Sequence, residues 1–272
     1  MKLSRPFLYL LASLFFIQAV SAQKQLAKEL SLYIPGEDGS NSGAVVWHPK
    51  FKRYYTSMIG NAVYPMAIFS DKGHLIDGNF EAGADLRGLW YNAATKQIEY
   101  NCYDEGGIGH YVLNATGEII NRESDKEGSY QPNEQSVGTY NEKDKLFVFP
   151  DNDFTLLSYK TIGGEIESRT KLHLDCSSKK QADEVSDQEM AERRDVRNTS
   201  VLYTGIKNSE FAVLNMDKNV IELYNGKTGL MTDKKRLPEG FSVPLYRSFN
   251  FSYANGIWWF FNKENRTWEG YK

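Results

Sequence analysis

The chain has 272 residues, of which 25% are charged and 14% are aromatic, with a formal net charge of −3 at pH 7. A mean hydropathy of −0.52 excludes a protein built mainly from membrane-spanning segments, so we expect no embedding in a membrane. The near-neutral charge leaves no basic footprint, so we expect no nucleic-acid partner.

The first 22 residues have the pattern of a secretory signal peptide. Lys2 and Arg5 give a basic start, an apolar stretch follows over residues 7–20, and Val20-Ser21-Ala22 precedes Gln23. This apolar stretch is too short to span a bilayer core of about 30 Å as a helix. We therefore expect an exported chain, secreted or periplasmic, whose single mature domain covers residues 23–272.

A pattern repeats along the rest of the chain: an aromatic residue ends a short apolar run, and a turn residue follows 24–26 residues later, or 19 in the last copy. The aromatic residues are Trp47, Tyr91, Tyr140, Tyr203 and Tyr246, and the turn residues are Gly73, Gly117, Gly164, Gly229 and Asn265. A period near about 45 residues with strand-like sequence inside each copy is typical of a β-propeller. We expect an all-β chain of five four-stranded blades, with six blades as the alternative.

The second copy shows its strands most clearly, because short runs with period-two alternation are separated by turn residues. The expected strands are 45–47, 53–55 and 66–69; 89–91, 97–103, 110–113 and 118–120; 138–140, 146–149 and 156–159; 201–203, 211–214 and 220–224; and 245–246, 249–253 and 257–261. The last copy is short. We expect residues 30–34 to add a strand to it and close the ring, which removes an open edge.

A charged insertion at about residues 177–197 separates the third and fourth copies, whose aromatic residues lie 63 residues apart. Ser186 and Glu189 have the spacing of a capping box, and Val185 and Met190 have the spacing of a hydrophobic staple. The insertion is therefore expected to hold a short helix, with a disordered loop as the alternative.

Two turn segments carry a family resemblance. Val-Leu-Asn-Ala-Thr-Gly-Glu-Ile-Ile at 112–120 and Leu-Tyr-Asn-Gly-Lys-Thr-Gly-Leu-Met at 223–231 resemble the turn between the third and fourth strands of YVTN-type and quinoprotein-type β-propellers. In outline the resemblance covers nearly all of the mature chain. It implies a fold and not an activity, because propellers include hydrolases, lyases, lectins and scaffolds. No ligand set for a quinone stands out, and we expect no cofactor.

Aligning the copies on their aromatic residues isolates one exceptional position. Four residues before the aromatic, the second copy has Arg87, where the other copies have small residues (Gly43, Ser136, Thr199 and Ser242). A guanidinium at the channel mouth needs a carboxylate partner, for which Asp85 and Glu134 are candidates. We expect Asp85, Arg87, Gln135 and Asn198 to form the polar wall of a ligand-binding pocket. The alternative is that Arg87 and Asp85 form a structural ion pair.

The sequence holds no nucleophile elbow, P-loop or dinucleotide fingerprint, and its four histidines are dispersed, so we expect neither a catalytic nor a metal site. The leading interpretation is a monomeric binding protein for a glycan or a protein. The alternative is a carbohydrate-active hydrolase or lyase that uses acidic residues such as Asp85 at the channel mouth. Cys102 and Cys176 form either a disulfide or two separate thiols, a choice that depends on geometry.

Overall fold

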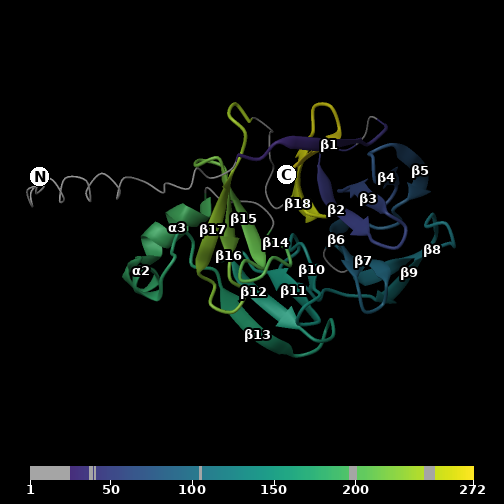
Figure 1. The fold of residues 1–272 in the computed structure, drawn as a ribbon. Helices are drawn as coiled ribbons and strands as arrows, with labels where there is room; N and C mark the ends of the chain where they lie inside the picture. Colours follow the sequence, from purple (N-terminus) through teal and green to yellow (C-terminus); the bar gives the residue numbers. More distant parts are fainter. Residues whose placement is uncertain (1–24, 37–38, 40, 104–105, 196–200, 242–248) are drawn as a thin grey trace, which may run out of the picture.

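The computed structural model describes residues 25–36, 39, 41–103, 106–195, 201–241 and 249–272. The expected signal peptide therefore lies outside the described residues. The strands form five four-stranded antiparallel sheets, arranged as the blades of a propeller (Figure 1). The five-bladed prediction is confirmed.

Each of the first four blades takes four consecutive strands, ordered from the channel to the rim. They are β2 (Ser42–His48), β3 (Arg53–Met58), β4 (Pro65–Ser70) and β5 (Leu75–Glu81) in blade 1; β6 (Leu86–Asn92), β7 (Gln97–Cys102), β8 (Ile108–Leu113) and β9 (Ile119–Lys126) in blade 2; β10 (Thr139–Asn141), β11 (Leu146–Pro150), β12 (Thr155–Tyr159) and β13 (Ile166–Lys171) in blade 3; and β14 (Leu202–Tyr203), β15 (Phe211–Asn215), β16 (Val220–Tyr224) and β17 (Met231–Arg236) in blade 4.

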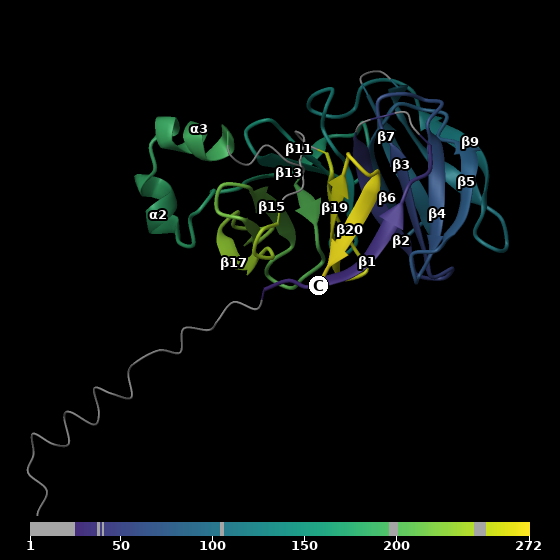
Figure 2. The same ribbon diagram turned by 90° about the horizontal axis from the view of Figure 1, so that it is seen from above.

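Blade 5 joins the two ends of the chain. It consists of β18 (Phe251–Ala254), β19 (Ile257–Asn262), β20 (Thr267–Tyr271) and, outermost, β1 (Lys28–Tyr33). Strand β1 runs antiparallel to β20, with Leu32 opposite Trp268, and Figure 2 shows the two strands side by side. The prediction that an N-terminal strand closes the ring is confirmed. The preceding residue Leu26 also donates its backbone N–H to the Arg236 carbonyl at 3.1 Å, which ties the closing segment to blade 4.

The expected strand order of blade 5 is wrong. Residues 249–253 were expected to follow an inner strand ending at Tyr246, yet β18 is itself innermost and β19 is second. Tyr246 lies outside the described residues. The shift arises because β1 supplies the fourth strand, so the C-terminal segment needs to provide only three.

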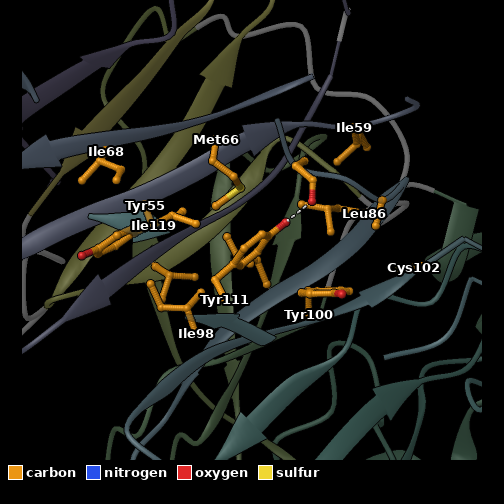
Figure 3. Close-up of a cluster of buried hydrophobic side chains, with 14 of the residues drawn as sticks. Tyr55, Ile59, Met66, Ile68, Leu86, Ile98, Tyr100, Cys102, Tyr111 and Ile119 are labelled. Carbon is orange, nitrogen blue, oxygen red and sulfur yellow. Dashed lines mark hydrogen bonds between the residues drawn. The ribbon is translucent and has the colours of Figure 1, made fainter. Parts of the chain in front are cut away.

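Large aromatic side chains fill the space between neighbouring blades, which explains much of the aromatic content. Figure 3 shows one such cluster, between blades 1 and 2, with Tyr55, Tyr100 and Tyr111 buried among aliphatic side chains. The Tyr111 hydroxyl donates to the Ala82 carbonyl at 2.8 Å, and the Tyr55 hydroxyl donates to the Gly117 carbonyl at 2.6 Å. Tyrosine suits these positions because each buried phenol finds an acceptor at the far side of the cluster.

The insertion forms two helices, α2 (Lys179–Glu184) and α3 (Asp187–Asp195), which lie outside the ring of blades (Figures 1 and 2). The helix predicted after Ser186 is confirmed, since the Ser186 hydroxyl accepts from the Glu189 backbone N–H at 3.2 Å. Val185 and Met190 pack in the same apolar cluster, as a staple requires. The Glu189 carboxylate, expected to complete the capping box, instead pairs with Arg193 at 2.6 Å.

The two cysteines are separate buried thiols. Of the two possibilities left open by the sequence, the structure therefore shows the unbridged one. In the described part of the chain, no helix is both long and apolar enough to cross a membrane.

Candidate functional site

A cavity of about 750 Å³ lies in the central channel and is lined by residues of the innermost strand of every blade. Among the described residues, blade 2 contributes Trp90 to its wall, and every blade contributes one further aromatic residue: Trp47, Tyr91, Tyr140, Tyr203 and Tyr253. We call these five residues the channel aromatics. Each one is the last or next-to-last residue of its inner strand, so all five lie toward the same end of the channel.

Glycines at the other end of the inner strands allow this arrangement. A Cβ on Gly88 would lie 2.6 Å from the backbone of Gly138, and a Cβ on Gly138 would lie 2.6 Å from the Phe149 ring. Strands β6 and β10 can therefore approach closely because Gly88 has no side chain, and the missing side chain of Gly138 leaves room for the Phe149 ring.

Four of the channel aromatics are partly exposed, and Tyr140 is buried. Because they line the cavity and most keep some exposed surface, they can pack against a bound molecule. Four of the five are residues on which the sequence repeats were aligned. Sequence reasoning missed the fifth, Tyr253, because it aligned the last copy on Tyr246.

His48 lies behind this wall, with its ring centroid 4.8 Å from that of Tyr91 and only 2% of its surface exposed. Its Nδ1 has no hydrogen-bond partner among the described residues. Burial, supported by the charge of Lys50, lowers the pKa of His48 below 6.5, although a hydrogen bond with the Lys96 backbone opposes the shift. The folded state therefore binds the His48 proton less readily than the unfolded state does.

We predict that His48 makes the fold less stable in acid. The contribution of the neutral His48 ring to the free energy of unfolding is complete above the unfolded pKa of about 6.5. It is lost as the pH falls from there through the lowered pKa of the folded state. Urea unfolding at pH 7.5 and pH 5 should show a smaller loss of stability for His48→Phe than for the natural chain. His173, whose pKa burial also lowers, should leave a residual loss in the variant. Equal losses in both proteins would contradict the assignment.

Two charged residues, Glu142 and Lys143, also line the cavity. The Lys143 ammonium pairs with the Glu210 carboxylate at 2.9 Å. Glu142 is exposed, and within the described part of the chain its carboxylate has neither an ion-pair nor a hydrogen-bond partner. Sequence reasoning did not single out either lining residue, although both follow Tyr140 within three positions.

The structure brings together three of the four predicted site residues. Arg87 is 7% exposed, and its Nε donates to Gln135 Oε1 at 3.0 Å. Its two terminal nitrogens bind both carboxylate oxygens of Asp85, so the predicted carboxylate partner is confirmed. The guanidinium lies over the ring of Tyr103, 4.5 Å from its centroid. Asn198, like the aligned residues Thr199 and Ser242, lies outside the described residues.

Arg87, Asp85, Gln135 and Tyr103 form what we call the Arg87 cluster. It lies at the start of β6, away from Tyr91 near the end of the same strand, and none of its members is among the residues that line the cavity. The other carboxylate candidate, Glu134, accepts instead from the Tyr103 hydroxyl at 2.8 Å. The contacts match those of a structural ion pair, and the ligand-binding role of the cluster stays a prediction.

Among its described residues, the cavity wall holds a single carboxylate, Glu142. Glycoside hydrolysis ordinarily uses two carboxyl groups, about 5–9.5 Å apart across the sugar bond. Asp85 binds Arg87, and Glu210 binds Lys143, so neither is positioned as a second group of the cavity. No group of three or more His, Cys, Asp or Glu residues in the described ranges is arranged to hold a metal ion.

The fold and the cavity together define a five-bladed β-propeller with an aromatic-lined channel. No protein-family model and no curated protein matches the sequence. Among solved structures, a gluconolactonase from Xanthomonas campestris has 13% identity and a TM-score of 0.43, over 93% of this chain and 82% of that one. A chain of a nidogen/laminin complex has 9% identity and a TM-score of 0.43, over 76% and 67%. Likenesses at this level say nothing about what this chain binds.

Proposed function

We propose that this chain is an exported, monomeric binding protein whose ligand, a glycan, packs against the channel aromatics. The observation that supports this proposal most directly is the contribution of at least one aromatic residue to the cavity by each of the five blades. Flat aromatic faces suit the apolar C–H face of a sugar ring, and tyrosine hydroxyls add hydrogen bonds. The leader-like residues 1–22 motivate export, which an intact-mass measurement of the exported chain tests.

Cavity size favours a glycan over the other expected ligand class, a protein. A volume of about 750 Å³ falls in the usual range of small-molecule sites, roughly 300–1,000 Å³. A stable protein partner ordinarily buries about 800 Å² on each side, which is more than a channel enclosed by five strands offers. Binding is also favoured over hydrolysis, because Glu142 is the only carboxylate on the described wall.

We expect calorimetric titration with a panel of soluble oligosaccharides to find at least one ligand. The single variants Tyr91→Ala and Tyr203→Ala should each weaken its binding by about tenfold or more, because each removes a stacking face worth about 1.4 kcal/mol or more. Tyr33→Ala is the matched control, since Tyr33 is an exposed tyrosine on the outermost strand of blade 5.

Three outcomes would contradict the proposal. Unchanged affinity in both channel variants would show that the ligand does not bind against the channel aromatics. Weakening by Arg87→Lys alone would place the ligand at the Arg87 cluster. Release of shortened sugars during the incubation, followed by chromatography, would favour the hydrolase or lyase.

A further inference from the structure

Among the described residues, the charge of the cavity wall reduces to one carboxylate. Lys143 is held by Glu210, which also accepts from the backbone N–H of Gly226 at 3.0 Å and of Asn208 at 3.1 Å. Burial acts to raise the pKa of Glu210, but the hydrogen bonds from Gly226 and Lys143 outweigh it and keep the pKa low. Both groups of this pair are therefore charged and satisfied by each other. Within the part of the wall that the structure describes, the remaining charge is that of Glu142.

Glu142 combines access to the cavity with partial loss of solvent. Its side chain is exposed, and within the described residues its oxygens have no partner. The surrounding wall nevertheless desolvates the carboxylate and raises the pKa of Glu142. A carboxylate in this position gains from a cation that enters the cavity, because it is already partly desolvated and gives up no existing bond to a described residue.

The channel aromatics beside Glu142 favour the same sign of charge. Burial is the main cause of the raised pKa of Tyr91, Tyr140 and Tyr203, and the negative charge of Glu142 adds to the shift in all three. The carboxylate therefore shares one region of the channel with these rings. Ring faces carry negative electrostatic potential and attract cations, with Trp and Tyr among the stronger examples.

Resting on the glycan binding proposed above, we infer that the sugar bound beside Glu142 carries a free ammonium group, which makes the ligand an amino sugar or an oligomer of one. Its ammonium would pair with the Glu142 carboxylate, and its ring would pack against the neighbouring channel aromatics. A neutral sugar would use the aromatic faces but leave the carboxylate without a counter-charge. The carboxylate of an acidic sugar would be repelled by the Glu142 carboxylate and by the negative potential of the aromatic faces.

Short glucosamine oligomers and their N-acetylated counterparts test this inference, because they differ only in the charge and substituent of the amine. In titrations at about pH 6, where an aliphatic amine is protonated, we expect the free-amine oligomer to bind about tenfold more tightly, as for a charge-assisted contact. Glu142→Gln should abolish the difference between the two oligomers. Glu165→Gln makes the same change at an exposed position just before the outermost strand of blade 3 and should preserve it.

The possible results separate this inference from the proposed function. Equal or tighter binding of the acetylated oligomer would overturn the amino-sugar assignment and leave glycan binding standing. The amino-sugar assignment would also fail, and glycan binding would also stand, if neither oligomer bound but a neutral or acidic sugar bound at the channel aromatics. Failure of every sugar would overturn both proposals. Binding of a lysine-containing peptide without any sugar would assign the carboxylate to a protein ligand and would likewise overturn the inference.

Discussion

Leu32→Ala is expected to lower the free energy of unfolding by about 2–5 kcal/mol, the usual cost of emptying a fully buried leucine site. Leu32 is 0% exposed and packs in the cluster that contains Trp259 and Trp268. Its strand β1 is the only strand of blade 5 that comes from the N-terminal part of the chain. For a domain of this size, the midpoint of thermal unfolding should fall by roughly 5–15 °C.

Tyr33→Ala is the control for this prediction, because Tyr33 is the next residue on the same strand and its side chain is 56% exposed. An exposed substitution usually changes stability by less than about 0.5 kcal/mol. Circular dichroism melts of the two variants therefore compare the inward and outward faces of β1 directly. Equal midpoints would contradict the claim that the inward face of β1 seals the ring.

The repeating aromatic residues predicted the number of blades because each one ends an inner strand in blades 1 to 4. The same local pattern could not place strands within blade 5. Residues 249–253 alternate like any strand, and alternation is the same at the channel, in the middle of a blade and at the rim. Only the long-range pairing of β1 with β20 decides that β18 is innermost. Helix α2 also went unpredicted, since none of its residues is buried and no apolar period marks it.

The candidate site was predictable in part. Four of the five aligned aromatic residues that defined the repeats line the cavity, although sequence reasoning used them only to place the blades. Arg87 attracted attention because it differed from the small residues at its position, and Asp85, one of the two carboxylates expected as its partner, binds it. Glu142 carries no such signal. A carboxylate in a turn after a strand is ordinarily solvated, and only the closure of five blades around it creates its partly desolvated setting.

Glu99→Ala should be the second strongly destabilising change. The Glu99 carboxylate is 7% exposed and accepts from Trp90 Nε1 at 2.9 Å, from Asn92 Nδ2 at 2.9 and 3.1 Å, and from Thr95 Oγ1 at 2.9 Å. Alanine would leave the buried donors of Trp90 and Asn92 without their acceptor. An unsatisfied buried group costs about 1–3 kcal/mol, so the total loss should reach about 3–5 kcal/mol.

Glu99→Gln separates the loss of stability caused by the missing acceptor from the loss caused by the missing side-chain volume. Glutamine fills the same space and keeps one acceptor oxygen, but it turns an N–H₂ group toward at least one donor, so about half of the loss should remain. Glu165→Ala, at an exposed position, should be close to neutral. Urea titrations should therefore rank the variants Glu165→Ala, Glu99→Gln and Glu99→Ala in order of falling stability. Trp90 and Asn92 flank Tyr91, so the folded fraction of Glu99→Ala should also bind the channel ligand more weakly. A Glu99→Ala chain as stable as the Glu165→Ala chain would show that these buried donors find other acceptors.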